Sequence, residues 1–234
     1  MSITTEILEK TGVDSATAGE FETYYSMLIE WNEKINLTAI TDETEVAQKH
    51  FADCLSIFKA GVIKDGDKIV DVGTGAGLPG LVMKIGNKSL DMTLMDSLGK
   101  RINFLNEVIA ELGLENVQTV HSRAEDFGKN KDYREKYDVC VSRAVANLAT
   151  LSELCLPLVK KGGYFISMKG PTATEEVEEA KKAIGILGGR FEEIKEYSID
   201  GTDFAHNLVI IRKMSNTPNS YPRKAPKPAK EPIK

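Results

Sequence analysis

The first 60 or so residues carry apolar side chains at helical spacing. In Thr17–Asn32 they recur every three or four positions, at Ala18, Phe21, Tyr24, Tyr25, Leu28 and Ile29. Val46–Ala60 repeats this pattern, and Gly61 follows it as a candidate C-cap. We therefore expect a helical N-terminal appendage over residues 1–63, which ends at the polar turn Lys64-Asp65-Gly66-Asp67.

Beyond this turn, short β-rich runs alternate with helical stretches. The pattern predicts strands at Lys68–Asp71, Met92–Met95, Val117–His121, Tyr137–Ser142 and Tyr164–Met168. It predicts helices between them, at Leu78–Gly86, Gly99–Leu112, Leu148–Leu158 and Thr174–Leu187. Alternating units of this kind form a parallel sheet that is covered on both faces, so we expect a doubly wound α/β domain over residues 64–213.

The end of the chain departs from this alternation. Phe191–Ile199 and Leu208–Lys213 are strand-like runs with no helix between them, and they predict an antiparallel hairpin at the far edge of the sheet. From Ser215 onward the chain holds five of its eight prolines, so residues 214–234 are expected to form a flexible or extended basic tail.

The charge of the chain is unevenly distributed. The 234 residues carry a formal net charge of −5, but the tail has five basic residues against one acidic residue, which leaves the remaining body near −9. Such a body repels phosphate, so charge alone does not indicate a nucleic-acid partner. The tail is compatible with a solubilising terminus or with an arm that follows RNA phosphates.

Other composition signals narrow the class of protein. The three cysteines, Cys54, Cys140 and Cys155, form no CxxC pair, so neither a disulfide framework nor a metal site is indicated. The N-terminus lacks the basic and apolar regions of a signal peptide, and no apolar run approaches the roughly 18 residues of a membrane span. We expect a cytoplasmic protein without a membrane partner, and a monomer.

The segment from Ile69 to Gly80 is the most informative. A buried strand runs into the glycine-rich turn Gly73-Thr74-Gly75-Ala76-Gly77, and a helix follows. Glycines permit positive φ and close approach of a ligand to the backbone. About 20 residues later the next strand ends in Asp96, where a carboxylate can accept hydrogen bonds from ribose hydroxyls.

Two kinds of cofactor fit this outline. Gly75, Gly77 and Gly80 also spell the dinucleotide fingerprint GxGxxG, which is a weak signal alone. Asp71, two residues before the first glycine, favours S-adenosylmethionine, because a carboxylate repels a diphosphate and attracts an ammonium or a sulfonium. The methionine end is therefore expected near Asp71 or Gly75.

The motifs along the chain resemble one family closely. They are Trp31-Asn32, Asn36-Leu37-Thr38, His50 with Asp53, Asp71–Gly80 (DVGTGAGLPG), Asp96–Arg101 (DSLGKR), Phe104-Leu105, Ser142-Arg143-Ala144, Lys169-Gly170 and Tyr221–Lys224 (YPRK). In this order and over nearly the whole chain they resemble the RsmG (glucose-inhibited division protein B) family. The resemblance implies a seven-stranded class I methyltransferase (Rossmann-like) sheet.

The same resemblance implies an activity and a set of contacts. Members of the family methylate N7 of one guanine in bacterial 16S ribosomal RNA, which we expect to be met in a 30S particle. Carried over to this sequence, the cofactor contacts are Gly73, Leu78, Ala124, Glu125 and Arg143. The adenine is expected beside Ala124 and Glu125.

The residues after the fourth strand bear on the reaction. No Asn/Asp-Pro-Pro-Tyr motif and no Pro-Cys pair is present, so methylation of an exocyclic amine or of cytosine C5 is not supported. Guanine N7 has no proton to lose and needs positioning more than a base. We expect Arg123, Arg143 and Lys169 to hold phosphates or guanine O6.

Alternatives remain for these residues and for the function. Lys169 is also consistent with a solvated strand end, Arg143 with a buried arginine paired to Glu125 or Asp96, and His50 with helix packing or capping. The alternative functions are methylation of a small molecule or protein, a nicotinamide or flavin oxidoreductase, and an RNA-assembly factor that retains the pocket without catalysis.

Overall fold

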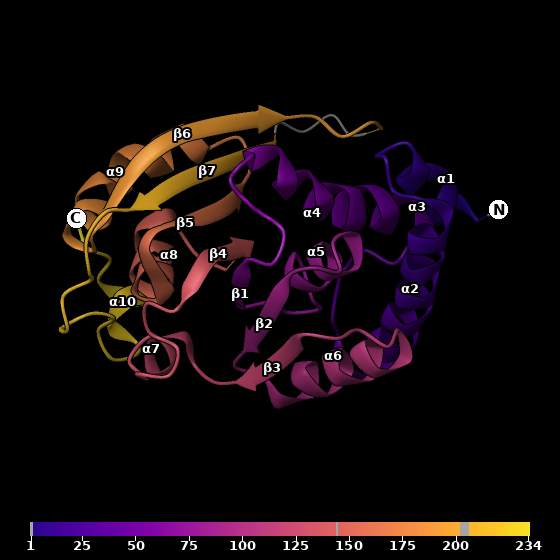
Figure 1. Ribbon diagram of the computed structural model, residues 1–234, viewed down its shortest axis with the longest axis horizontal. Helices are drawn as coiled ribbons and strands as arrows, with labels where there is room; N and C mark the ends of the chain where they lie inside the picture. The colour runs from indigo at the N-terminus through magenta and orange to yellow at the C-terminus, as the bar shows by residue number, and fades with distance from the viewer. Residues whose placement is uncertain (1, 144, 202–205) are drawn as a thin grey trace.

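The computed structural model describes residues 2–143, 145–201 and 206–234, and it shows a seven-stranded sheet between two layers of helices (Figure 1). Ala144 of the Ser142-Arg143-Ala144 motif lies outside the described residues. The strands are β1 (Lys68–Val72), β2 (Asp91–Asp96), β3 (Val117–His121), β4 (Tyr137–Arg143), β5 (Val159–Lys169), β6 (Gly189–Tyr197) and β7 (His206–Lys213). All seven were expected from the sequence pattern.

The strand order is β3-β2-β1-β4-β5-β7-β6. The ladders β1–β2, β1–β4, β2–β3 and β4–β5 are parallel, whereas β7 runs antiparallel to both β5 and β6. The predicted hairpin is confirmed at the sheet edge, with β7 as its inner strand. The order reverses between β1 and β4, where open α/β sheets bind ligands beyond the carboxyl ends of their strands.

The N-terminal helices cover one face of the sheet. They are α1 (Ile3–Glu9), α2 (Ser15–Ile35), α3 (Glu43–Val46), the π-helical η1 (Ala47–Ala52), α4 (Asp53–Leu55) and the 3₁₀-helical η2 (Ser56–Ala60). In α2, the Asp14 carboxylate caps the first turn, and Asn36 ends the helix in the left-handed conformation. The buried residues of α2, among them Phe21 and Tyr24, share one core with sheet residues such as Ile69.

The remaining helices complete the two layers. They are α5 (Gly80–Gly86), α6 (Gly99–Glu111), α7 (Ala124–Phe127), α8 (Leu148–Cys155), η3 (Leu156–Leu158), α9 (Ala173–Ile186) and α10 (Lys227–Lys230). Successive residues of β1 point to opposite faces of the sheet. Ile69 packs with the N-terminal helices, and Val70 packs with α8 and α9. Within the described part of the chain, every helix is too short or too polar to cross a bilayer.

Residues 214–234, which were expected to form a flexible or extended basic tail, are docked on the α/β domain. Arg223 pairs with Glu153 of α8 through Nη2 and Oε2 at 2.6 Å, and the side chain of Glu153 is only 1% exposed. Thr217 and Pro228 are also buried. The physical reason is that a buried carboxylate needs a counter-ion and hydrogen bonds, and Arg223 supplies them. The tail lies at the end of the molecule opposite to α1 (Figure 1).

Candidate cofactor site

The turn between β1 and α5 requires its glycines for two different reasons. Gly73, Gly75 and Gly77 have φ values of 74°, 60° and 96°, a region that side chains disfavour. Gly80 has ordinary φ, but a Cβ there would lie 2.5 Å from Leu94 Cδ2. The predicted helix therefore begins only at Gly80, after the turn.

Asp96 at the end of β2 holds the turn from one side. Its Oδ2 accepts the N–H of Gly75 at 2.9 Å, and its Oδ1 accepts the N–H of Leu98, also at 2.9 Å. Arg101 Nη1 approaches Oδ2 at 3.4 Å. The carboxylate is buried, and these hydrogen bonds fix the direction of both of its oxygens. It lines the cavity that the turn borders.

Asp71 holds the turn from beneath. Its side chain is fully buried, and its Oδ2 accepts the N–H of Gly80 at 2.8 Å. Burial raises the pKa of this carboxyl to about 6, although the hydrogen bond from the Gly80 N–H opposes the rise. Asp71 does not line the cavity, so the expected direct contact with the methionine end is corrected to a supporting role under the turn.

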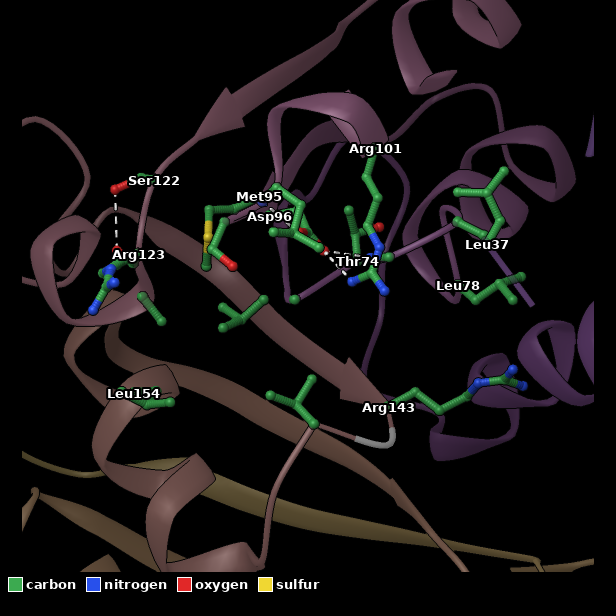
Figure 2. A pocket seen from close by; sticks show the side chains of 18 of the residues that line it. Leu37, Thr74, Leu78, Met95, Asp96, Arg101, Ser122, Arg123, Arg143 and Leu154 are labelled. Carbon is green, nitrogen blue, oxygen red and sulfur yellow. Dashed lines mark hydrogen bonds and ion pairs between the residues drawn. The ribbon is translucent and has the colours of Figure 1, made fainter. Parts of the chain in front are cut away.

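A cavity of about 760 Å³ opens where β1, β2 and β4 end. This volume lies within the roughly 300–1,000 Å³ of ordinary small-ligand sites. The sequence-predicted residues that line it are Gly73, Gly75, Leu78, Asp96, Arg123, Ala124, Glu125 and Arg143. Figure 2 shows Ser122 and Arg123 on one side of the cavity and Leu37 and Leu78 on the other.

Arg143 extends from the end of β4 toward the N-terminal helices (Figure 2). Its Nη1 lies 2.6 Å from Asp53 Oδ2 and 3.1 Å from the Lys49 carbonyl oxygen. The alternative partners suggested by the sequence, Glu125 and Asp96, are not the ones it contacts. Arg143 is a half-buried arginine that lines the cavity and whose charge is paired with Asp53.

Lys169 is placed differently from every expectation. Its Nζ lies 2.7 Å from the Ala146 carbonyl oxygen and 2.8 Å from Glu176 Oε2, and its side chain is only 8% exposed. It does not line the cavity, and it is not a solvated strand end. The expected contact with RNA is therefore corrected, because both partners and the burial of the ammonium keep it inside the protein.

Comparison with known proteins decides the family. The family model described as rRNA small subunit methyltransferase G matches residues 17–204. A relative named ribosomal RNA small subunit methyltransferase G from Clostridium perfringens is 54% identical over 92% of this chain and 90% of its own length. The relative of the same name from Clostridium tetani is 52% identical over 95% and 93%. The chain belongs to this family.

A solved structure supports the fold at low identity. The crystal structure of a SAM-dependent methyltransferase from Aquifex aeolicus matches 73% of this chain and 93% of its own, with a TM-score of 0.52 and 21% identity. At this identity the likeness concerns the fold alone. Together with the family match it confirms the class I methyltransferase sheet that the sequence motifs imply.

Two of the family motifs line the cavity from the helical appendage. Asn32 Oδ1 accepts the N–H groups of Leu37 and Thr38 at 2.6 and 2.8 Å, which turns the chain sharply after α2. Thr38 Oγ1 then lies 2.8 Å from His50 Nε2, and Arg143 Nη2 lies 3.0 Å from His50 Nδ1. Leu37, Thr38 and His50 all line the cavity.

These appendage residues were not assigned to the site from the sequence. Their motifs were visible as Asn36-Leu37-Thr38 and His50 with Asp53, but their spacing does not tell which face of the sheet they reach. His50 is a packing residue whose ring nitrogens are both engaged. Burial and the neighbouring Arg143 lower its pKa to about 4, so it is neutral near pH 7.

Asp53 joins three elements behind the cavity. Besides Arg143 of β4, it accepts the Tyr197 hydroxyl of β6 at 2.7 Å, and its Oδ1 lies 3.1 Å from His206 Nδ1 of β7. The carboxylate is itself nearly buried. The wall of the cavity is therefore tied to the hairpin edge of the sheet as well as to the helices.

Proposed function

We propose that this chain transfers the methyl group of S-adenosylmethionine to N7 of a specific guanine in 16S ribosomal RNA. Membership of the rRNA small subunit methyltransferase G family supports the reaction class and the RNA. One observation supports this choice of cofactor: the backbone N–H groups of the glycine turn already donate hydrogen bonds to oxygen atoms of the protein.

A dinucleotide site needs free backbone N–H groups that point at the diphosphate. Here Gly73 and Thr74 donate to the Met95 carbonyl at 2.9 and 3.0 Å. Gly75 donates to Asp96 and Gly80 donates to Asp71. A diphosphate would have to displace a carboxylate at both of the latter positions, so the turn disfavours an anionic cofactor.

The same arrangement suits a cofactor that is cationic at its reactive end. S-adenosylmethionine, when bound, supplies a methyl group activated on a sulfonium. We assign its ribose hydroxyls to Asp96 and its adenine to the wall formed by Ala124 and Glu125. Gly73, Gly75 and Leu78 would face its methionine part, and Asp71 would act from beneath the turn.

Methylation of N7 places modest demands on the protein. The N7 lone pair forms the new N–C bond while the S–C bond breaks, and no proton leaves the guanine, so no general base is required. Among the described residues that line the cavity, His50 has both ring nitrogens engaged, and the carboxylates of Asp96 and Glu125 are assigned to the cofactor. Catalysis by positioning can supply about 7–11 kcal/mol of the barrier in favourable cases.

The RNA is expected to meet the rim of the cavity. Arg123 is exposed at the start of α7 and lines the cavity, and we assign it to a phosphate or to guanine O6. Lys224, Lys227 and Lys230 are exposed on the docked tail. The negative body favours a 30S particle as substrate, in which ribosomal proteins or a folded RNA shape assist recognition, and we propose that the protein acts as a monomer.

Methyl-labelled S-adenosylmethionine and 30S subunits from a strain without the enzyme provide the test. We expect one label per subunit, mapped to a single 7-methylguanosine in 16S ribosomal RNA, with naked RNA as a weaker substrate. Arg123→Gln should raise KM for the particle without weakening cofactor binding.

The alternatives give different results in the same experiment. Label on a protein or a small molecule would replace RNA as the substrate. Binding of NADH without any methyl transfer would overturn the cofactor assignment. Tight binding of S-adenosylmethionine with no transfer to RNA, protein or small molecule would favour an assembly factor.

A further inference from the structure

The chain enters α8 through a short segment that follows β4, Val145–Leu148, which we call the post-β4 segment. Val145 is 42% exposed and lines the cavity. It lies against the glycine turn, because a Cβ added to Gly73 would lie 2.7 Å from Val145 Cγ2. The position of this segment therefore sets the width of the cavity beside Gly73.

One ion pair holds the post-β4 segment at two backbone atoms. Lys169 Nζ donates to the Ala146 carbonyl oxygen, and Glu176 Oε2 accepts the N–H of Leu148 at 2.9 Å. The same Oε2 atom lies 2.8 Å from Lys169 Nζ. The ion pair therefore forms hydrogen bonds with the carbonyl of Ala146 and with the N–H of Leu148, two residues further on. The charges of Lys169 and Glu176 neutralise each other.

The two members of the pair come from rigid elements. Lys169 ends β5, and Glu176 lies in the first turn of α9. The turn between them is itself held, since Asn207 Nδ2 donates to the Gly170 carbonyl at 3.0 Å. Within the described residues, this pair links the sheet and α9 to the segment that borders the cavity.

We propose that Lys169 and Glu176 are positioning residues that fix the post-β4 segment as a wall for the target base. This inference rests on the proposed function for the identity of the base. Lys169 acts through Ala146 and Val145 and does not touch the RNA. A displacement of about 1 Å at a reacting site can lower the rate about 100-fold, so loss of the pair should act on kcat.

Glu176→Gln separates this role from direct RNA contact. If Lys169 held a phosphate, removal of its acidic partner would leave methylation unchanged or improved. If the pair holds the segment, Glu176→Gln and Lys169→Met should each lower kcat by about 10- to 100-fold, with KM for the 30S particle within about twofold. The double variant should be no slower than the slower single variant, because both remove one device.

Salt dependence gives a second readout. A lost phosphate contact would reduce the slope of log K against log salt by about 0.7–0.9 in Lys169→Met. We expect the slope to equal that of the parent. Glu178→Gln is the matched control, because Glu178 lies on the same helix in an exposed pair with Lys181 at 2.6 Å and should leave kcat unchanged.

Hydrogen exchange at Leu148 tests the proposal without any activity. The Leu148 N–H should exchange faster in Glu176→Met, which has no side-chain oxygen to accept it, than in the parent and the Glu178→Gln control. Unchanged exchange, unchanged kcat in Glu176→Gln or a reduced salt slope in Lys169→Met would overturn the proposal. If the parent methylates no RNA but the Leu148 N–H still exchanges faster in the variant, the proposed function is wrong and the positioning role of the pair is retained.

Discussion

The guanidinium of Arg143 and the carboxylate of Asp53 form a nearly buried ion pair with an N–O distance of 2.6 Å. The two residues are 90 positions apart, one at the end of β4 and the other in the helical appendage. The pair orients Arg143 along the cavity wall. It also joins the appendage to the sheet at the edge where the strands present the candidate site.

Removal of one partner of this pair should be costly. Asp53→Asn leaves the buried guanidinium without its counter-ion and weakens the contacts with Tyr197 and His206, so we expect the free energy of unfolding to fall by about 3–5 kcal/mol. Urea denaturation measures this change. The double variant Asp53→Asn/Arg143→Met should be less destabilised than Asp53→Asn; equal or greater loss in the double variant would contradict the pairing.

The glycine turn also depends on a tyrosine of α2. The buried Tyr24 hydroxyl donates to the Ala76 carbonyl oxygen. Tyr24→Phe leaves that carbonyl without its buried donor, and we expect a loss of about 1–3 kcal/mol in stability together with weaker binding of S-adenosylmethionine. Calorimetric titration measures the affinity.

Tyr25→Phe is the matched control for this variant. Tyr25 follows Tyr24 in the helix, and its hydroxyl donates to the Thr41 carbonyl at 3.0 Å, in an exposed setting away from the turn. Cofactor affinity should stay at the parent value. Equal effects of the two variants would show that the Tyr24 hydroxyl has no specific role in the turn.

Two buried groups should make opposite contributions to the pH dependence of stability. The pKa of Asp71 is raised to about 6, so its neutral form is favoured in the folded state, and its contribution is lost as pH rises from about 4 through 6. The pKa of His50 is lowered to about 4, so its contribution is present above about 6.5 and is lost as pH falls through 4. Each contribution is on the order of 3 kcal/mol.

Single variants should therefore reveal opposite slopes between pH 4 and 6.5. Relative to the parent, Asp71→Asn should lose stability on acidification, because the His50 contribution is no longer opposed. His50→Gln should gain stability on acidification over the same range. Chemical denaturation at several pH values measures both, and parallel profiles for the three proteins would contradict these pKa shifts.

The docking of the tail rests on Arg223. Its Nε and Nη2 reach the buried Glu153 carboxylate, and its backbone N–H donates to Oε1 at 2.7 Å. Arg223→Met should lower the free energy of unfolding by about 3–5 kcal/mol, because it leaves the buried carboxylate of Glu153 without a counter-ion. Urea denaturation should show partial recovery when Glu153→Gln is added, and no recovery would argue against the pair.

The exposed lysines of the tail supply a contrasting variant. Replacement of Lys224, Lys227 and Lys230 by glutamine should leave stability within about 0.5 kcal/mol of the parent. If these three residues follow RNA phosphates, the salt slope of binding to the 30S particle should fall by about 2–3, at roughly 0.7–0.9 per lost contact. An unchanged slope would assign them to solubility alone.

The sequence by itself determined the succession of the seven strands and of the longer helices between them, the glycine turn and the acid that ends β2. These features depend on neighbours within about 20 residues: the alternation of apolar runs, the need for positive φ at Gly73, Gly75 and Gly77, and the place of Asp96 after its strand. The family motifs extended this to the reaction class, because their order along the chain is specific.

Only the tertiary structure decided what the charged residues do. Lys169 and Arg223 were expected to be free for RNA or solvent, and for Arg143 a pair with Glu125 or Asp96 was the alternative to RNA; the three are instead paired with Glu176, Glu153 and Asp53 on other elements. A buried charge must be neutralised by whichever group the fold brings near it. That partner can lie up to 90 residues away, as for Arg143 and Asp53, and no local pattern in the sequence records it.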